Sequence, residues 1–288
     1  MTAEGSPTLR RRKLAAELRR LREDADLNGV QVARALKWST SKISRMENGQ
    51  VAPSHDDVTK LVAHYGVAND LARSLLGLVQ ADGERSWWDA YSDVLSETVL
   101  ELIGLEAAAT TVRTWRAMVI PGLFQTREYA AQITANYQAL EFTPPRTVER
   151  RTEARMRRQR RLTSAPTLAY EAVIDESALR RRFGDSKLMN EQLRHLVKVS
   201  ELPNVTVRIL TLDQPHPIDI ENFVLLSFPA MPVVGALPDT VYSEHHPHFT
   251  LTDDSETVYK YALVFDLLTQ AALDPDASRD FIASLAGM

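Results

Sequence analysis

The stretch LNGVQVARALKWSTSKISRMENGQVAPS (residues 27–54) carries the strongest local pattern in the chain. Asn28 is suited to cap a helix over 29–37, and Ser39 is suited to cap a second helix over 40–48. A glycine directly follows the second helix, where a left-handed C-terminal cap is expected. The stretch therefore predicts two short helices joined by a tight turn.

The second of these helices has one polar side and one apolar side. At roughly 100° per residue, its short polar side chains and one arginine fall within an arc of about 140°, while Ile43 and Met46 point the other way. The polar arc consists of Thr40, Ser41, Ser44, Arg45 and Asn48. An arginine on such an arc can pair bidentately with guanine in a major groove. The pattern is typical of a helix-turn-helix whose second helix reads DNA.

Apolar residues at helical spacing predict three more helices around this pair, so the N-terminal part should be an all-α head of five helices. These helices are expected over about 9–25, 53–66 and 69–80. The segment 84–112 is rich in helix formers with an apolar stripe, and it predicts a helical connector. The expected domains are a DNA-binding head (1–80), the connector (81–111) and an α/β sensor or partner-binding domain (112–288).

The C-terminal part alternates strand-like and helical segments, which predicts an α/β domain with a mixed sheet and flanking helices. Strands rich in Val, Ile, Leu and Tyr are expected over 166–174, 204–212, 222–228 and 239–244, and residues 112–124 are expected to be extended up to Pro121-Gly122. Helices are expected over 126–140, 144–162, 175–182, 186–201, 254–272 and 275–286. The whole chain therefore predicts a multidomain protein, with an all-α head in front of an α/β body.

Composition limits the kinds of function that the chain can have. It has 288 residues, 44% of them hydrophobic and 25% charged, which is ordinary for a water-soluble protein. No cysteine is present, so disulfides, thiol nucleophiles and Cys-ligated metals are excluded. No apolar run is long enough for a membrane span, and no signal peptide is recognisable. We expect a cytoplasmic, nucleoid-associated protein.

The charge is distributed unevenly. Residues 1–65 hold 12 Lys and Arg against 8 Asp and Glu, a net charge of +4. Because the whole chain carries −4, residues 66–288 carry −8. A basic head on an acidic body indicates that the head alone binds an anionic partner.

Residues 9–66 resemble the Xre-type regulators, whose DNA-binding domain is like that of the lambdoid phage repressors. The resemblance rests on the motif 27–54, including Ala33, Ile43 and the closing Glu47-Asn48-Gly49. It implies a lambda-repressor-like fold and an operator of double-stranded DNA. Since one helix-turn-helix reads only a half-site, we expect a homodimer on a two-fold operator.

The resemblance also implies roles for particular residues. Base contacts are expected from Thr40, Ser41 and Arg45, and the polar face adds Ser44; phosphate contacts are expected from Asn28, Lys42 and Asn48. Two positions depart from the family pattern. Gly29 stands where a phosphate-binding Gln is common, and Lys37 stands at a turn position that is usually Gly. A left-handed Lys37 would cost about 1 kcal/mol.

Several segments of the body resemble the C-terminal domain of the WhiJ-like group of actinomycete regulators. These segments are 87–110, 118–130, 153–162, 175–184, 192–210 and 241–244. The resemblance implies a transcription factor of development or secondary metabolism. It also implies control through the C-terminal domain by a small acidic partner protein, and a small-molecule effector is the alternative.

An arginine-rich segment lies in the body. Between Arg146 and Arg161 the chain has eight Arg and two Glu. The segment could be a second nucleic-acid surface, a dock for an acidic protein, or a solvated or structural helix. The residues proposed for partner binding are Arg150, Arg151, Arg155 and Arg158.

Histidines raise the question of a metal site. His216, His245, His246 and His248 lie near carboxylates in the sequence, and imidazole with carboxylate suits zinc. No two histidines have the helical spacing of a zinc protease, so an exposed His-rich loop is the simpler interpretation. We therefore predict no metal site, with a metal-dependent hydrolase as the least favoured alternative.

Other features are compatible with catalysis or ligand binding without requiring it. Asp175-Glu176-Ser177 can supply a helix cap or a catalytic carboxylate, and capping is the simpler role. The aromatic residues Trp87, Trp88, Tyr91 and Trp115 can pack a core or line a pocket for an apolar effector. The chain has no nucleophile elbow, P-loop, dinucleotide fingerprint or HExxH motif. We therefore expect no enzyme and no cofactor, and the rival interpretation is a protein-interaction adaptor.

Overall fold

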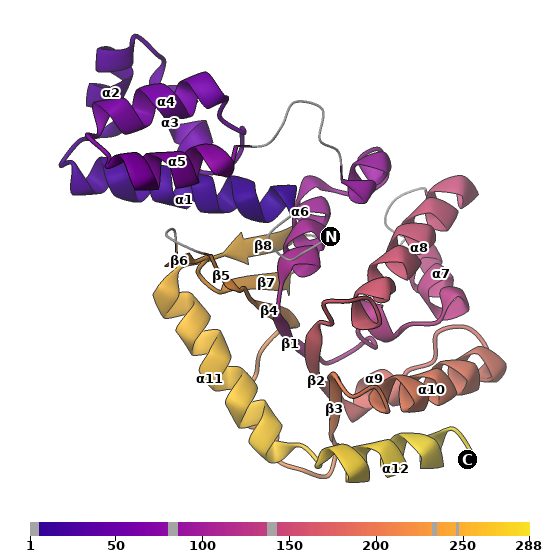
Figure 1. Cartoon of the computed structure of the whole chain (residues 1–288). Helices are drawn as coiled ribbons and strands as arrows, with labels where there is room; N and C mark the ends of the chain where they lie inside the picture. The colour runs from indigo at the N-terminus through magenta and orange to yellow at the C-terminus, as the bar shows by residue number, and fades with distance from the viewer. Residues whose placement is uncertain (1–5, 80–85, 137–142, 232–234, 246–247) are drawn as a thin grey trace. The chain divides into compact units, whose positions relative to one another are not determined.

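The computed structural model describes residues 6–79, 86–136, 143–231, 235–245 and 248–288. Contacts between Cα atoms divide the chain into two compact units. The first unit comprises Met1–Trp87 with Pro229–Leu237, and the second comprises Trp88–Phe228 with Pro238–Met288. The expected fold class is confirmed, because five helices form the N-terminal part and a mixed six-stranded sheet with flanking helices forms the C-terminal part (Figure 1).

The helices of the first unit begin and end close to the residues that their caps predict. They are α1 (Pro7–Asp24), α2 (Gly29–Leu36), α3 (Thr40–Glu47), α4 (His55–His64) and α5 (Asn69–Gly77). Their core is formed by Leu14, Leu18, Val32, Ile43, Met46, Val58, Leu61 and Leu75, all at most 2% exposed. The Ser54 hydroxyl accepts a hydrogen bond from the Asp57 amide at 3.1 Å, which starts α4. Each helix therefore buries one apolar face in a shared core.

The helical connector expected over 84–112 consists of two separate helices. A 3₁₀ helix, η2 (Trp87–Tyr91), is followed by a separate helix, α6 (Glu97–Ala108). Ser96 causes the break, because its hydroxyl caps the Val99 amide at 3.4 Å and so starts a new helix there. Residues 80–85 lie outside the described part of the chain. The expected connector is therefore divided, because its residues up to Trp87 belong to the first unit and those from Trp88 onward to the second.

The sheet of the second unit has the order β3-β2-β1-β4-β7-β8. Its strands are β1 (Thr111–Arg116), β2 (Ala169–Asp175), β3 (Val205–Leu210), β4 (Phe223–Ser227), β7 (Thr240–His245) and β8 (His248–Thr252). The pairs β1–β2 and β2–β3 are parallel, whereas β4, β7 and β8 extend the other edge in antiparallel fashion. The sequence did not predict β8, nor the short strands β5 (Ala230–Met231) and β6 (Gly235–Ala236).

Helices lie along both faces of this sheet. The parallel strands need helical crossovers, which are supplied by α7 (Arg127–Asn136), α8 (Pro145–Gln159), α9 (Glu176–Arg180) and α10 (Ser186–Ser200). On the other side, α11 (Ser255–Ala271) packs Phe265 and Leu268 against Trp115 and Phe223 of the sheet. The chain then ends in α12 (Pro275–Leu285), beside β3 and α10. Figure 1 shows α11 and the crossover helices on opposite sides of the strands.

Candidate nucleic-acid interface

The turn between α2 and α3 requires one residue in the left-handed region. Lys37 occupies it, with φ 56° and ψ 40°, and the Trp38 amide then donates a 2.8 Å hydrogen bond to the Ala33 carbonyl. Two residues after Lys37, the Ser39 hydroxyl accepts a hydrogen bond from the backbone amide of Lys42 at 3.2 Å and so starts α3. The expected helix-turn-helix is therefore present, and Lys37 bears the backbone cost that the sequence indicated.

Because of this conformation, Lys37→Gly should stabilise the first unit by about 1 kcal/mol. Glycine enters the left-handed region without the steric clash that a Cβ atom causes. The change is measured as a higher midpoint of thermal unfolding, followed by circular dichroism at 222 nm. The control is Lys60→Gly in α4, where helical backbone makes glycine destabilising by about 1 kcal/mol. A Lys37→Gly protein less stable than the parent would contradict the assignment of strain to this turn.

The helix α3 presents its polar arc to solvent. Thr40, Ser41, Ser44 and Arg45 are all exposed, whereas Ile43 and Met46 on the opposite face are 2% and 1% exposed. The Arg45 Nε atom donates a hydrogen bond to the Ser41 carbonyl at 3.4 Å, and the side-chain amide of Asn48 donates one to the Ser44 hydroxyl at 3.3 Å. Both contacts lie at the surface of α3, so these side chains are organised without being buried.

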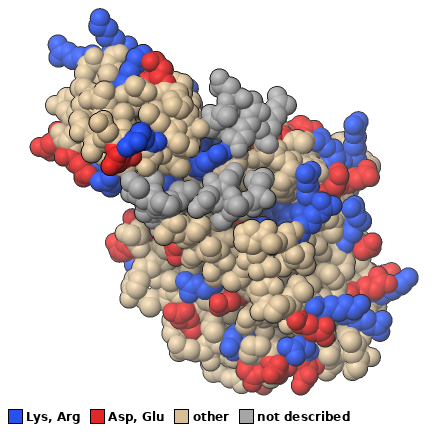
Figure 2. Space-filling model, in the orientation of Figure 1, with Lys and Arg blue, Asp and Glu red and all other residues tan. Residues whose placement is uncertain are grey.

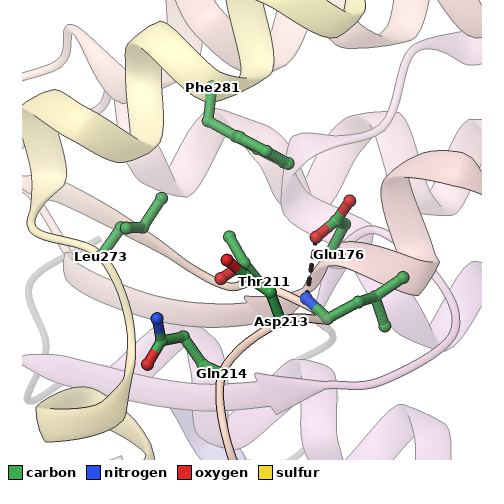
Figure 3. A pocket seen from close by; sticks show the side chains of 7 residues that line it. Glu176, Thr211, Asp213, Gln214, Leu273 and Phe281 are labelled. Atoms are coloured by element: carbon green, nitrogen blue, oxygen red, sulfur yellow. Dashed lines mark hydrogen bonds between the residues drawn. The ribbon is translucent and has the colours of Figure 1, made fainter.

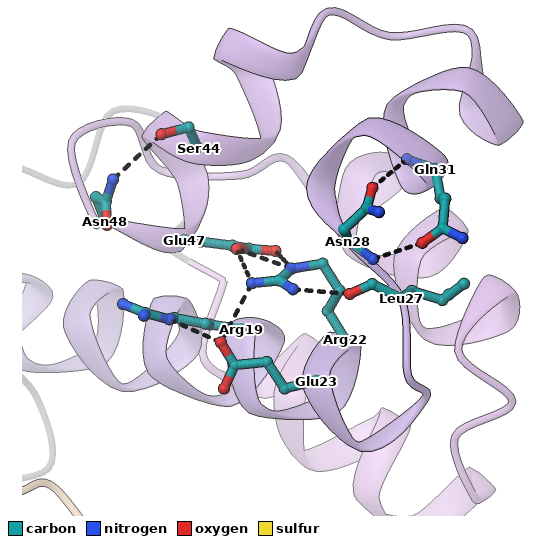
Figure 4. A network of polar contacts seen from close by, with 9 residues as sticks. All are labelled: Arg19, Arg22, Glu23, Leu27, Asn28, Gln31, Ser44, Glu47 and Asn48. Atoms are coloured by element: carbon teal, nitrogen blue, oxygen red, sulfur yellow. Dashed lines mark hydrogen bonds and ion pairs between the residues drawn. The ribbon is translucent and has the colours of Figure 1, made fainter.

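A bidentate ion pair fastens the end of α3 to the end of α1 (Figure 4). Arg22 donates through Nε to Glu47 Oε1 at 2.8 Å and through Nη2 to Glu47 Oε2 at 3.0 Å. Its third nitrogen, Nη1, donates to the Leu27 carbonyl at 2.8 Å, in the segment that leads into α2. The Glu47 hydrogen bond outweighs burial and raises the pKa of Arg22 above its ordinary value. One guanidinium thus joins α1, the loop before α2, and α3.

Arg22 was not among the residues predicted for the site, and Glu47 was named only as part of the motif. The two residues are 25 positions apart in the chain. No periodicity within a helix signals a contact at that separation. The available signal was composition alone, since Arg22 is one of many arginines in α1.

Asn28, one of the residues expected at phosphates, also starts a helix. The Asn28 side chain accepts a hydrogen bond from the Gln31 amide at 3.0 Å, and the Gln31 side chain accepts one from the Asn28 amide at 2.7 Å. This capping box starts α2, whose first residue is Gly29. A Cβ atom added to Gly29 would lie 3.8 Å from Ile43 Cγ2, an ordinary van der Waals contact. Asn28 and Asn48 are both exposed.

The third residue, Lys42, has a strong partner within the chain. Its Nζ atom lies 2.5 Å from Asp57 Oδ1 and 4.0 Å from the centre of the Trp38 ring. Burial raises the pKa of Asp57, but hydrogen bonds from Lys42 and Ser54 outweigh it and hold that pKa below its ordinary value. The ion pair therefore stabilises the fold above the ordinary aspartate pKa, and its contribution is lost as pH falls through the lowered value. A phosphate contact by Lys42 must compete with Asp57.

Releasing this lysine should strengthen binding to DNA of any sequence. In Asp57→Asn, the Lys42 charge is no longer neutralised, so the slope of log affinity against log salt should steepen by about 1. Fluorescence anisotropy with a random duplex at several salt concentrations measures the slope. The control is Asp56→Asn, which removes the same charge from the neighbouring residue, where the carboxylate pairs with Lys60. Equal slopes for the two variants would show that Asp57 does not restrain Lys42.

The four arginines proposed for partner binding are engaged within the second unit. Arg150 pairs with Asp93 and the Ala90 carbonyl, and Arg151 donates to the Val94 carbonyl at 2.7 Å. Further along α8, Arg155 donates to Gln125 at 2.6 Å, and Arg158 donates to Glu106 at 2.6 Å and 3.0 Å. These bonds fasten α8 to η2, α6 and the segment before α7. They favour the structural alternative, and binding of an acidic partner by these arginines stays a prediction.

The histidines and the Asp175 carboxylate, which were considered for a metal site or for catalysis, lie in different parts of the second unit. His216 packs edge-on against the Trp115 ring, whereas His245 and His248 pair across β7 and β8, and His246 lies outside the described residues. Within the described ranges, no three His, Asp or Glu residues are grouped as metal ligands. Asp175 accepts a hydrogen bond from the Ser177 amide at 2.8 Å and so acts as the expected helix cap.

Three of the four candidate aromatic residues are buried, and Trp87 is partly exposed. Trp115 is fully buried, and Trp88 and Tyr91 are at most 5% exposed. Trp115 belongs to the core between the sheet and α11. Core packing, the simpler of the two alternatives, therefore describes Trp115.

A cleft of about 460 Å³ lies beyond the carboxyl ends of β2 and β3 (Figure 3). Its polar lining includes Glu176, Thr211, Asp213 and Gln214, and its apolar lining includes Leu273 and Phe281. Glu176 is held in place, because it accepts a hydrogen bond from the Leu212 amide at 2.8 Å and pairs with Arg180.

Together, the helix-turn-helix geometry and the exposed polar face of α3 define a DNA-binding protein of the helix-turn-helix class. Residues 13–75 match a helix-turn-helix domain, and residues 99–284 match a domain of unknown function, DUF5753. The second match covers more than half of the chain, which therefore belongs to the DUF5753 family. No curated protein and no solved structure matches the chain.

These matches support part of the expected identity. A helix-turn-helix domain before a DUF5753 domain is consistent with an Xre-like regulator. None of the described helices combines the length and apolar character that crossing a membrane requires.

Proposed function

We propose that this protein binds a two-fold DNA operator as a homodimer and regulates transcription from it. The observation that carries the proposal is the α3 helix, which buries Ile43 and Met46 and leaves four polar side chains exposed on one arc. An exposed arginine among short hydroxyl side chains is suited to read base edges in a major groove. Proteins with this motif usually bind DNA as symmetric dimers, in which each head reads one half-site of the operator.

The roles of individual residues follow from their positions. Thr40, Ser41, Ser44 and Arg45 are proposed to contact bases, because they lie exposed along α3. Asn28, Lys42 and Asn48 are proposed to contact phosphates. The backbone amides at the start of α2 support this, since a helix N-terminus attracts anions and Gly29 leaves the approach open. Lys42 contributes once it leaves Asp57.

The second unit is proposed to control the first. The resemblance to the WhiJ-like group favours control by a small acidic partner protein, in a pathway of development or secondary metabolism. A small-molecule effector is the alternative, and the cleft beyond β2 and β3 has a volume in the usual range for ligands. Regulation of transcription places the protein in the cytoplasm, with the nucleoid.

Sequencing the genomic DNA that co-purifies with the protein tests the proposal. We expect a small set of enriched sites that share a sequence with two-fold symmetry. A duplex carrying that sequence should bind saturably, with an affinity that falls as salt is raised. The control is a scrambled duplex of the same length and composition.

The adaptor interpretation gives a different result in the same experiment. If the basic head binds only an acidic protein, no sequence is enriched and no saturable binding to DNA occurs at modest salt. That outcome would refute the proposed function. Enrichment without symmetry would refute the two-fold operator but keep sequence-specific binding.

A further inference from the structure

The cleft beyond β2 and β3 has a lining of distinct composition. Seven residues line it, of which two are acidic, three are apolar and none is basic. All of them belong to the second unit. The volume of about 460 Å³ lies in the usual range for small-molecule sites, in which an apolar lining and a few polar groups hold the ligand. The composition of the lining therefore favours a ligand that has an apolar body and a positive charge.

The hydroxyl group of Thr211 is a polar group without a partner at the wall of this cleft. Thr211 directly follows β3 and is 8% exposed. Among the residues that the structure describes, none forms a hydrogen bond with this hydroxyl. Buried hydroxyls are nearly always hydrogen-bonded, because an unpaired one has lost its hydration without compensation. The partner of the Thr211 hydroxyl must therefore come from the contents of the cleft.

Glu176 places a carboxylate at the cleft, and its side chain is 8% exposed. One carboxylate oxygen accepts a hydrogen bond from the Leu212 amide at 2.8 Å, and the other pairs with Arg180. The Arg180 side chain is 53% exposed and lies one turn further along α9. Exposed ion pairs of this kind contribute little to stability. A ligand cation can therefore replace Arg180, while the Leu212 amide keeps the carboxylate in position.

Most other charges on the segments around the cleft already have partners. Arg208 donates to a backbone carbonyl at 3.3 Å, Arg279 pairs with Asp276 at 3.2 Å, and the carboxylate that caps α12 accepts from two backbone amides. Asp213 and Asp280 form no ion pair within the described ranges, and Asp213 lines the cleft. On the face drawn in Figure 2, basic and acidic side chains are interspersed over the second unit. Selection for positive charge therefore comes from the lining rather than from a broad surface field.

We propose that this cleft binds a small organic cation, namely a primary ammonium group on an aromatic or apolar body. The ammonium donates to the Glu176 carboxylate and the Thr211 hydroxyl, because its three N–H groups need oxygen acceptors. The body packs against Phe281, and Figure 3 shows the Phe281 ring and the Glu176 carboxylate extending toward the same space from α12 and α9. An anion would be repelled by Glu176 and Asp213, and a neutral ligand would leave Glu176 paired with Arg180. The role of this ligand as an effector rests on the proposed function, whereas its binding does not.

Titration calorimetry of the full chain with 2-phenylethylammonium chloride, at low salt and neutral pH, tests the ligand class. We expect saturable binding with a dissociation constant of about 0.1–1 mM, as suits a ligand of this small size. The neutral 2-phenylethanol, the anionic 3-phenylpropanoate and the ring-free ethylammonium should each bind at least about 10-fold more weakly. No saturable binding of 2-phenylethylammonium, or equal binding of 2-phenylethanol, would overturn the proposal.

Removing the internal competitor should strengthen binding, a gain that misfolding cannot produce. In Arg180→Ala, the Glu176 carboxylate has lost its cation, so the affinity for 2-phenylethylammonium should rise by about 3-fold or more. Arg181→Ala is the matched control, because Arg181 is the exposed neighbour outside the lining. It should bind as the parent does. Unchanged or weaker binding in Arg180→Ala would overturn the replacement of Arg180 by the ligand.

Two further variants test the acceptors. Glu176→Gln keeps the shape of the side chain and should lower the affinity for 2-phenylethylammonium by at least about 10-fold. Thr211→Val removes only the hydroxyl and should lower it by about 3- to 10-fold. Asp280→Asn is the control for charge alone, because Asp280 is exposed on α12 beside Phe281 but does not line the cleft. Equal losses in Asp280→Asn and Glu176→Gln would overturn the site, and Arg180→Ala and Thr211→Val decide it if Glu176→Gln does not fold.

These measurements contain no DNA, so their failure is distinguishable from failure of the proposed function. A protein that binds its operator but not 2-phenylethylammonium would overturn the cation site alone. A protein that binds the ammonium as expected but enriches no DNA sequence would refute the proposed function alone.

Discussion

Replacing Glu47 with alanine should lower the stability of the first unit by about 2–4 kcal/mol, somewhat less than for a fully buried ion pair. The change leaves the Arg22 guanidinium, whose side chain is 13% exposed, without its two hydrogen bonds to a carboxylate. It also frees the end of α3 from α1 and from the loop that the same guanidinium holds through Leu27. We expect the recognition helix to open and operator affinity to fall with it.

Hydrogen exchange of the α3 amides in the full chain measures this effect, because it reports the opening of that helix directly. Glu23→Ala is the matched control, since its exposed carboxylate also reaches Arg22, at 3.3 Å, but makes only a surface ion pair. Exchange rates that are equal in Glu47→Ala and Glu23→Ala would contradict the role of the clamp.

Replacing Arg45 with alanine should weaken binding to the cognate operator by about 1–3 kcal/mol per site and relax the preference at one base pair. Arg45 is the longest cation on the exposed arc of α3, and a bidentate contact to a base is lost with it. The fold should be unaffected, because the side chain is exposed and its one hydrogen bond is to the Ser41 carbonyl.

Competition binding against all single-base variants of the operator checks this prediction. Arg34→Ala serves as the control, because Arg34 is an exposed arginine of α2, outside the proposed base-contacting arc. It should change the salt dependence at most, with no change in base preference. If Arg45→Ala binds the operator with the affinity of the parent, the proposed base contact is wrong.

The Glu47→Ala and Arg45→Ala variants distinguish the residues that position α3 from the residue that contacts a base. Glu47 and Arg22 set the position of α3 without facing outward, whereas Arg45 faces outward and adds little to stability. A loss of affinity caused by unfolding acts on every DNA sequence equally. A loss of affinity caused by a missing base contact depends on the DNA sequence, so the competition assay distinguishes the two causes.

Prediction from the sequence worked best where the cause is local. Helix starts at Asn28, Ser39 and Asp175 were predicted correctly, because a capping side chain bonds to an amide two or three residues away. The strand segments around 169–175 and 205–210 were also recognised, because their β-branched and apolar residues are typical of strands. The strand β8 was missed, although its residues, HFTLT, include Phe and two β-branched threonines, because the segment was interpreted as part of a His-rich loop.

The partners of charged side chains within the fold were not predicted. The sequence left a nucleic-acid surface, a dock for an acidic protein and a structural helix open for the arginines of α8, and in the structure Arg158 reaches Glu106, 52 residues away. Lys42 suggested a phosphate contact, but Asp57 lies beside it across the gap between α3 and α4. A long charged side chain pairs with whatever the fold brings near, so its partner does not follow from local spacing.

By itself, the amino-acid sequence determined the helix-turn-helix, the outward polar arc of α3 and the division into an all-α and an α/β part. These depend on periodicity and caps, which act within one or two helical turns. Only the tertiary structure decided the Arg22–Glu47 clamp, the strand order and the cleft that Glu176 and Thr211 line together. Those features depend on which elements pack together, because Glu176 and Phe281 line one space only when α12 lies beside β3.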